Sequence, residues 1–441
     1  MDTIYARASG VGQSGIAVIR LSGAQSLSIL QKLSGKQNWP PRQLIRAWLK
    51  DDNDALLDDA LAVYFPQGQS YTGEDVVELH IHGGYAVLNG ILDYLAEQDG
   101  LRLAERGEFT RRAYENGRMD LTEAEAVADI IHAETSHQRK QALNQLGGSL
   151  SRLYDDWRNQ LIKALAWYEA HMDFSDEEIP ADLDTQVNER IHSLKTQMLQ
   201  HLGDHHRGEV LRKGVQLAII GAPNAGKSSL LNYLTREEAA IVSDTAGTTR
   251  DIVERHLDIH GFPVVLADTA GLRKTADKIE IEGIKRAQSK ALEANLVIAL
   301  FDSQKPADAE TLDILSQLNS KVIILRTKAD LGHAYTSPIG DYEPLLVSLK
   351  TGKNMDVFQE QLHTYLQEIC ASGDDVLITR QRHRRCVIDT LDALTRYEEG
   401  FDAVLKAEDL RSALSAVGRL TGHVDVEQLL DVIFADFCIG K

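Results

Sequence analysis

The chain has few cysteines and no long apolar run, and both shortages exclude classes of protein. Its three cysteines, Cys370, Cys386 and Cys438, are scattered without metal-ligand spacing, so we expect a reducing compartment. No window of about 18 apolar residues occurs, so we expect no membrane span. The N-terminal residues lack the basic and apolar regions of a secretory signal. The cytoplasm is therefore the expected location.

Positive charge is also scarce, since the formal net charge is −19. A chain with this charge does not attract nucleic acid through its overall field. RNA binding would need a local basic patch or a basic partner. The densest basic runs are 380–385 and Arg111-Arg112. We expect both to be solvated helix faces, with an RNA-binding patch as the alternative.

A phosphate-binding loop is present at residues 221–228, Gly-Ala-Pro-Asn-Ala-Gly-Lys-Ser. An apolar run at 215–220 predicts a strand before it, and 229–234 predict a helix after it, which is the context this motif requires. Backbone N–H groups and the helix N-terminus can bind phosphate oxygens. Lys227 can reach the β- and γ-phosphates, and the Ser228 hydroxyl can ligate Mg²⁺. The predicted contacts here are Asn224, Ala225, Gly226, Lys227, Ser228 and Ser229.

Two further segments predict contacts with the γ-phosphate and its Mg²⁺. A strand predicted at 262–267 leads to a D-x-x-G motif, whose Asp can hold Mg²⁺ through water. The polar stretch 243–251 predicts a mobile loop in which Thr249 completes the Mg²⁺ shell; an ordinary surface turn is the alternative. The predicted contacts are Ser243, Asp244, Thr245, Ala246, Gly247, Thr248, Thr249, Asp268, Thr269, Ala270 and Gly271.

The base is predicted to be guanine. A strand at 322–325 leads to Thr327-Lys328-Ala329-Asp330, which resembles the N-K-x-D motif of GTPases. Asp330 can accept from the guanine N1–H and N2–H, a donor pair that adenine lacks, and the Lys328 stem can cover the base. Thr327 replaces the usual Asn, so we expect a side-chain amide near the base to be lost. After a strand at 345–347, the guanine O6 contact is predicted at Ser348, Leu349 and Lys350.

The group that orients the attacking water is missing from its usual place. Ras-like GTPases follow D-x-x-G with Gln, but here the next residue is Leu272. The acidic segment 277–282 offers carboxylates that can replace it. The alternative is a solvated helix start, where acids are favoured by the helix dipole.

The length predicts two or three domains in a multidomain α/β protein. Residues 1–117 predict an α+β domain, in which His80 and His82 share a strand face and are expected to pack or contact substrate. Apolar residues recur at i, i+4 on both sides of the nucleotide module. They predict one helical domain built from 118–213 and 374–441, with a doubly wound P-loop GTPase domain inserted at 214–373.

Several short segments, in this order, resemble the MnmE (TrmE) family of tRNA-modifying GTPases from end to end. They include Tyr71-Thr72-Gly73-Glu74-Asp75, Phe109-Thr110-Arg111-Arg112-Ala113 and the C-terminal Phe437-Cys438-Ile439-Gly440-Lys441. The resemblance implies a homodimer that works with the FAD-containing flavoprotein MnmG in a heterotetramer or larger complex. It implies that an aminomethyl or carboxymethylaminomethyl group is added to C5 of the wobble uridine of certain tRNAs. GTP is hydrolysed, and 5-formyl- or 5,10-methylene-tetrahydrofolate supplies the one-carbon unit.

The same resemblance implies roles for particular residues. Arg20, Glu78, Arg118 and Lys441 match folate-contacting positions, with Arg118 where the family commonly has Lys. Glu280 matches the carboxylate that positions water. Cys438 is predicted to lie near the one-carbon site, either as a nucleophile or as a small apolar anchor for the tail. The residues that match ligands of a catalytic K⁺ are Asn224, Ser243, Thr245 and Thr248.

Two other functions remain open from the GTPase motifs alone. One is a regulatory GTPase switch in ribosome or RNA assembly, without modification chemistry. The other is a membrane GTPase prenylated at Cys438, which is disfavoured because Gly440 is not aliphatic and Lys441 is not a usual last residue. The N-terminal segments and the tail favour the modification enzyme.

Overall fold

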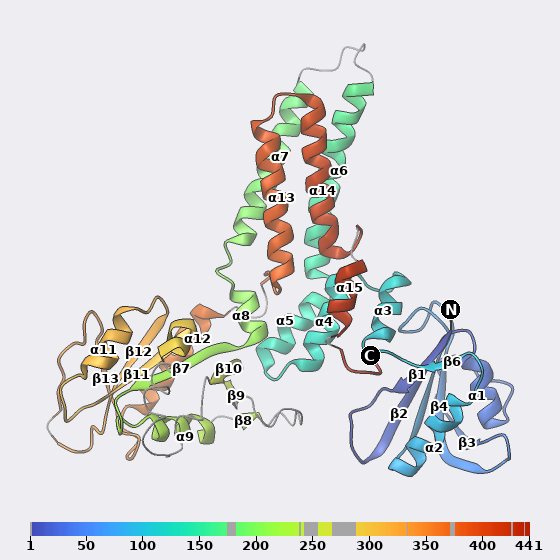
Figure 1. Cartoon of the computed structure of the whole chain (residues 1–441), viewed down its shortest axis with the longest axis horizontal. Coiled ribbons are helices and arrows are strands. Elements are labelled where there is room, and N and C mark those ends of the chain that lie inside the picture. The colour runs from blue at the N-terminus through green and yellow to red at the C-terminus, as the bar shows by residue number, and fades with distance from the viewer. Residues whose placement is uncertain are drawn as a thin grey trace. The chain divides into compact units, whose positions relative to one another are not determined.

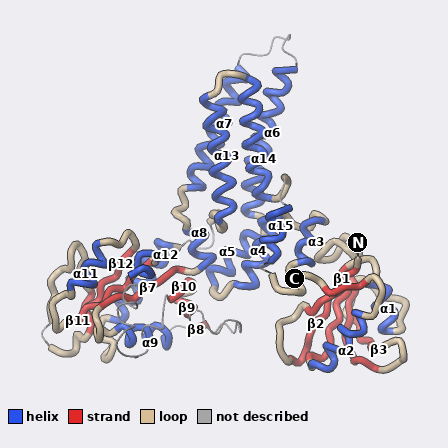
Figure 2. Tube along the Cα trace, in the orientation of Figure 1, coloured by secondary structure: helices blue, strands red, loops and turns tan. Residues whose placement is uncertain are grey.

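The computed structural model (Figures 1 and 2) divides into two compact units, and each is described by itself. The first unit contains residues 1–128, 146–166 and 410–441, and the second contains 129–145 and 167–409. Each unit is therefore assembled from segments distant in sequence. The structure describes residues 2–173, 182–237, 240–241, 255–266, 288–332, 334–370, 375–424, 427–435 and 437–441.

The first unit is built on a sheet in which, among the described residues, six strands take the order β3-β4-β5-β2-β1-β6. Neighbouring strands are antiparallel except for the parallel pair β1 and β6. The strands are β1 (Thr3–Arg7), β2 (Ser14–Ser22), β3 (Ile45–Lys50), β4 (Leu56–Phe65), β5 (Val76–Gly83) and β6 (Leu101–Leu103).

Helices α1 (Ser26–Ser34) and α2 (Tyr85–Ala96) pack against one face of this sheet. Alternate residues of β5 supply that face, and Val77, Leu79 and Ile81 are buried in one core with the helix residues. The period of two follows from strand geometry, because successive side chains point to opposite faces. The intervening residues Glu78 and His80 therefore lie on the other face.

The C-terminal segment packs inside the same unit. Helix α15 (Glu427–Ala435) contacts α3 (Glu108–Glu115), and its Phe434 is buried with Phe437 and with the start of α4 (Leu121–His132). Gly107 has φ +67°, and a Cβ there would lie 2.7 Å from the Phe434 carbonyl oxygen. Glycine is required at this close approach.

The second unit contains a sheet in which, among the described residues, seven strands take the order β13-β12-β11-β7-β10-β9-β8. The neighbouring pairs from β13 to β10 are parallel, and β9 is antiparallel to β10 and β8. The strands are β7 (Val215–Gly221), β8 (Ala240–Ile241), β9 (Arg255–Ile259), β10 (Phe262–Leu266), β11 (Leu296–Asp302), β12 (Lys321–Thr327) and β13 (Leu345–Leu346).

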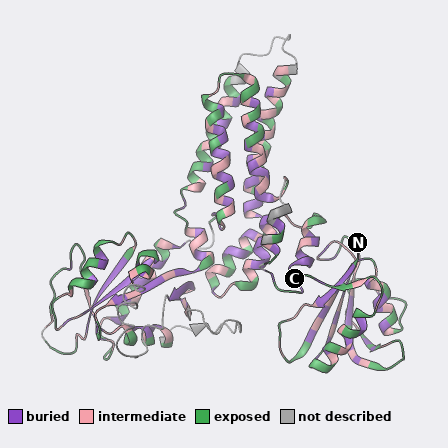
Figure 3. Ribbon diagram, viewed as in Figure 1, coloured by how far each residue is buried: buried purple, intermediate pink, exposed green. Residues whose placement is uncertain are grey.

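Helices cover both faces of this sheet, and its central strands are buried (Figure 3). Helices α9 (Lys227–Glu237) and α12 (Met355–Ile369) contribute to one core, and α11 (Ala309–Ser316) contributes to the other. Strands covered on both faces are apolar nearly throughout, as in Leu296–Asp302. This is the doubly wound fold predicted for a P-loop domain.

The remaining long helices carry single apolar stripes. In the second unit α7 (Asp182–Leu202) packs along α13 (Gln381–Glu399). The Tyr168 hydroxyl lies 2.9 Å from the Tyr397 hydroxyl. The Tyr397 hydroxyl donates to Asn188 Oδ1 at 2.7 Å. Further helices are α5 (Ser136–Leu146), α6 (Ser149–Asp173), α8 (Arg207–Lys213) and α14 (Ala403–Thr421).

The predicted multidomain α/β fold is confirmed, while the domain boundaries 1–117, 118–213, 214–373 and 374–441 remain predictions. The sequence patterns above give no prediction for strand β11, which joins β7 to β12. One sequence expectation is wrong. The basic runs are not simply solvated faces, because the side chains of Arg112 and Arg384 are 6% and 11% exposed and lie among carboxylates. Ion pairing, which the sequence does not show, permits their burial.

Candidate functional sites

The phosphate-binding loop lies between β7 and α9, as predicted. Gly221 has φ +144° and Gly226 has φ +108°, and Asn224 between them is also left-handed at +62°. A Cβ on Gly221 would collide with the Leu300 carbonyl oxygen of the neighbouring strand β11. The two glycines therefore allow the backbone turn that brings several N–H groups toward one centre.

Lys227, the first residue of α9, reaches back across this loop. Its Nζ donates to the carbonyl oxygens of Gly221 at 2.5 Å and Ala222 at 2.9 Å. Burial lowers the pKa of Lys227, because the low-dielectric surroundings disfavour the ammonium. An anionic phosphate beside it would offset that effect, so the residue fits a phosphate ligand. Ser228, the predicted Mg²⁺ ligand, follows it and is exposed.

The base-reading segment contacts the phosphate loop directly. The Thr327 hydroxyl donates to the Ala225 carbonyl oxygen at 2.6 Å and lies 3.3 Å from that of Phe301. Its methyl group is 3.5 Å from the position that a Cβ on Gly226 would take. The expectation that replacing Asn merely removes a polar group is therefore incomplete, because the Thr hydroxyl makes a buried hydrogen bond of its own.

Asp330 and Ser348 also meet, although they come from different loops. The Ser348 hydroxyl donates to Asp330 Oδ1 at 2.7 Å, and this hydrogen bond lowers the pKa of Asp330. The Ala329 N–H donates to the Val347 carbonyl oxygen at 3.1 Å, which holds the two loops together. Asp330 is therefore an ionised acceptor at neutral pH, as guanine recognition requires.

Asp302 is a residue of this site that the sequence analysis missed. It ends β11, and its Oδ2 accepts from Lys328 Nζ at 2.7 Å. Burial raises the pKa of Asp302, but hydrogen bonds from Lys328 and the Gln304 backbone more than offset this, so the net shift is downward. The sequence signal for this residue is a carboxylate at the end of an apolar run. It indicates a site residue only if β11 has first been predicted as a strand.

The roles predicted for the other residues of this site remain predictions. Leu349 and Lys350 follow Ser348 in the described part of the chain, and Ser229 is exposed on α9. The residues of the predicted switch loop, of D-x-x-G and of the acidic segment lie outside the described residues. They are Ser243, Asp244, Thr245, Ala246, Gly247, Thr248, Thr249, Asp268, Thr269, Ala270, Gly271, Leu272 and Glu280.

A second group of predicted residues converges in the first unit. Arg20 on β2 and Glu78 on β5 are cross-strand partners, and Arg20 donates to Glu78 Oε1 through Nε at 2.9 Å and a terminal nitrogen at 2.8 Å. The guanidinium lies 5.4 Å from the ring centre of Tyr71 and 5.6 Å from that of Phe109. The other Glu78 oxygen is 3.6 Å from His80 Nε2.

Lys441 comes from the far end of the sequence, and the charges of the same pair act on it. Ile439 forms an antiparallel bridge with Arg106, and Gly440 at φ +102° passes against the Arg7 carbonyl. Burial lowers the pKa of Lys441, the Arg20 charge lowers it further, and the Glu78 charge partly opposes both. The site thus combines two cations with one carboxylate, which suits a ligand that carries both N–H donors and carboxylates.

The other two predicted residues of this site are less constrained. Arg118 is exposed, and its stem packs against Gly73, with Cγ 3.2 Å from the position a Cβ on Gly73 would take. Cys438 is an exposed free thiol, whereas the neighbouring Phe437 is 3% exposed. The expectation that Cys438 anchors the tail as an apolar residue is therefore wrong, because Phe437 fills that role.

No helix among the described residues has both the length and the apolar character needed to cross a membrane. This finding concerns helices only. It adds to the composition of the chain, in which no long apolar run occurs.

Comparison with known proteins gives full-length matches. Family models for the MnmE helical domain and for the GTP-binding protein TrmE N-terminus match residues 121–438 and 3–118. The tRNA modification GTPase MnmE of Parvibaculum lavamentivorans is 48% identical over 446 residues, covering 100% of both chains. That of Paramagnetospirillum magneticum is 47% identical over 443 residues, with the same coverage.

Among solved structures, the G domain of the T. maritima FeoB iron transporter is 26% identical and covers 35% of this chain and 99% of its own. Its TM-score of 0.24 is too low to support a conclusion. The identity over whole chains is decisive: this chain belongs to the MnmE family of tRNA modification GTPases, and it is a GTP hydrolase that takes part in tRNA modification.

Proposed function

We propose that this enzyme hydrolyses GTP to GDP and phosphate in order to modify C5 of the wobble uridine of certain tRNAs. In this proposal a tetrahydrofolate carries the one-carbon unit and the flavoprotein MnmG is the partner. The observation that carries the proposal is the Arg20–Glu78 ion pair beside Tyr71 and Phe109, with the tail that ends in Lys441 passing against the neighbouring strand β1. A GTPase that acts only as a switch does not need a second ligand site of this kind, remote in sequence from its nucleotide loop.

The residues around that pair fit 5-formyl- or 5,10-methylene-tetrahydrofolate. Glu78 Oε2, which Arg20 does not use, can accept from the pterin amino and ring N–H groups. Lys441, Arg20 and Arg118 can attract the folate carboxylates. When bound, the folate supplies a one-carbon unit at the oxidation level of its substituent. The chain's own residues orient it and leave the Cys438 thiol exposed beside the tail.

For the nucleotide, we propose that Ser228 and Thr249 ligate Mg²⁺ and that Asn224, Ser243, Thr245 and Thr248 hold K⁺. Bound there, both ions would stabilise charge that develops on the phosphates. Of these residues, Ser228 and Asn224 lie in the described phosphate loop, and the left-handed Asn224 is exposed. We further propose that Glu280 positions the attacking water.

We propose a homodimer formed through the N-terminal domain. On β3 and β4 the side chains of Trp48 and Leu61 are 52% and 42% exposed, on the sheet face opposite α1 and α2. An exposed apolar face of this kind favours association with a second copy. Since tRNA is the proposed substrate, we place the enzyme in the cytoplasm.

The proposal is tested by nucleoside analysis of tRNA from cells that lack this protein. Wild-type chain should restore the modified wobble uridine. Cys438→Ser and Lys441→Ala should not restore it, although both variants should hydrolyse GTP at the wild-type rate in vitro. Lys227→Ala should lose both activities. Normal tRNA nucleosides in the deleted cells would favour the regulatory GTPase instead.

A further inference from the structure

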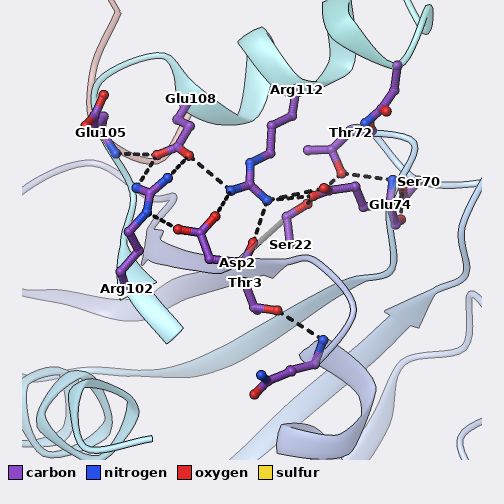
Figure 4. Close-up of polar contacts among 12 residues, drawn as sticks. Asp2, Thr3, Ser22, Ser70, Thr72, Glu74, Arg102, Glu105, Glu108 and Arg112 are labelled. Carbon is purple, nitrogen blue, oxygen red and sulfur yellow. Dashed lines mark hydrogen bonds and ion pairs between the residues drawn. The ribbon is translucent and has the colours of Figure 1, made fainter. Parts of the chain in front are cut away.

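Arg112 forms the centre of a buried ionic network in the first unit (Figure 4). One terminal nitrogen donates to Glu74 Oε2 and to the Asp2 carbonyl oxygen, each at 3.0 Å. The other donates to Glu108 Oε1 and to Asp2 Oδ1, each at 3.1 Å. A guanidinium that is 6% exposed must have such partners, because an unpaired buried charge is strongly destabilising.

The network has two arms, which differ in what they hold. On one side, Glu108 and Asp2 also bind Arg102, so these residues join the N-terminus, β6 and α3. We call Asp2, Arg102 and Glu108 the terminal arm. They give α3 a fixed position on the sheet, which is a contribution to stability.

On the other side, Glu74 lies in the loop between β4 and β5. The Ser22 hydroxyl donates to Glu74 Oε2 at 2.7 Å and lies 2.7 Å from the Thr72 hydroxyl. The Ser70 hydroxyl donates to the Glu74 carbonyl oxygen at 2.5 Å. We call Glu74, Ser22 and Thr72 the loop arm, because together they hold residues 70–75 against the end of β2.

The loop held in this way carries part of the Arg20–Glu78 site. The Tyr71 ring lies 5.4 Å from the Arg20 guanidinium, and the Tyr71 hydroxyl lies 2.8 Å from that of Thr110. Gly73, two residues on, packs against the Arg118 stem. The loop arm therefore connects a buried ion pair to Arg20 and Arg118, two of the three cations proposed to attract the folate carboxylates.

We infer that the Arg112–Glu74 ion pair is a positioning device for the tetrahydrofolate site: it fixes the loop at 70–75 so that Tyr71 orients Arg20 and Gly73 supports Arg118. The inference rests on the proposed function. It assigns Arg112 and Glu74 no contact with the ligand. A site whose groups are held by a rigid surrounding shell binds more tightly than one whose groups must be ordered on binding.

The network supplies its own control, because the same substitution can be made in each arm. Glu74→Gln and Glu108→Gln each remove one charge paired with Arg112 and change the side-chain volume little. Binding of 5-formyl-tetrahydrofolate to the full-length variants is measured by calorimetry, alongside thermal unfolding and GTP hydrolysis. Glu74→Gln should weaken binding about tenfold, whereas Glu108→Gln should change it by less than about twofold.

Both variants should lower the unfolding temperature, so a loss of stability alone does not predict the expected difference between their folate affinities. Glu108 also pairs with Arg102, and its loss should destabilise at least as much as that of Glu74. Ser22→Ala provides a milder second test if Glu74→Gln does not fold. It removes two hydrogen bonds of the loop arm without creating an unpaired charge, and it should weaken binding about threefold.

The possible outcomes separate the two proposals. Equal affinities in Glu74→Gln, Ser22→Ala and wild type would overturn the inference and leave the folate site in place. Equal weakening by Glu74→Gln and Glu108→Gln would also overturn it, because the effect would then follow stability. A wild-type protein that does not bind the folate would remove the proposed function itself, and the inference with it.

Discussion

The Thr327 hydroxyl donates a 2.6 Å hydrogen bond to the carbonyl oxygen of Ala225, so the first residue of the predicted base-reading segment is bound to the phosphate loop. Thr327→Val has nearly the same shape but no donor, and it leaves that carbonyl unpaired. An unpaired buried group costs about 1–3 kcal/mol, so we expect fluorescent GDP to bind about tenfold more weakly. Thr327→Ser keeps the hydroxyl and should bind normally. If the Val variant also binds normally, this hydrogen bond does not support the site.

Asp330→Asn should change the base specificity of the nucleotide site from guanine to xanthine. The pKa of Asp330 lies below its ordinary value because Ser348 donates to the carboxylate, so wild type presents an ionised acceptor at neutral pH. The amide of the variant offers an N–H where guanine also has one, whereas xanthine presents an acceptor there. We expect loss of GTP and gain of xanthosine triphosphate in a competition assay. Unchanged GTP affinity would show that another residue reads the base.

Potassium should be required for rapid hydrolysis. An ion held by Asn224 and the 243–248 loop would offset phosphate charge as an arginine finger does, an effect of about 10³-fold or more in that precedent. Steady-state turnover should therefore be fast in K⁺ and slow in Na⁺, whose radius is too small for the site. Asn224→Ala should abolish the difference between the two salts. Equal wild-type rates in both salts would exclude this role.

Glu280→Ala should slow hydrolysis without weakening nucleotide binding. Leu272 cannot polarise water, and a positioned acid or base commonly contributes about 10²–10⁴-fold. A loss of turnover with unchanged nucleotide affinity is typical of a contact made in the transition state. Glu282→Ala is the matched control and should be much milder. A larger effect at Glu282 would mean that Glu280 has been assigned the wrong role.

Folate affinity should fall as the pH rises, and at a lower pH than an ordinary lysine would require. The pKa of Lys441 is lowered by burial and by Arg20, so its ammonium loses the proton at a lower pH than an ordinary lysine, whose value is about 10.4. If the ammonium attracts the ligand, affinity should decrease as the pH rises through that lowered pKa. Lys441→Arg stays charged and should show little pH dependence in the same titration. A flat wild-type profile would argue against contact with Lys441.

The burial of Arg112 could not be predicted from the sequence alone. Next to Arg111 in a helix it was expected to face solvent, yet its side chain is 6% exposed and pairs with Glu74, Glu108 and Asp2. Two of those partners, Glu74 and Asp2, lie far away in sequence, and no local sequence pattern indicates that they pair with Arg112. Ion pairs between distant residues can be found only after the strands and helices have been placed.

The sequence by itself determined the elements and motifs whose signals are local. A glycine loop between an apolar strand and a helix needs only adjacent residues to be recognised, and so does the order of the base-reading segments. Only the tertiary structure decided that the tail before Lys441 passes against β1, that Thr327 donates to the phosphate loop and that Phe437, not Cys438, anchors the tail. Those contacts depend on strand order and chain packing, which bring together residues that no sequence spacing relates.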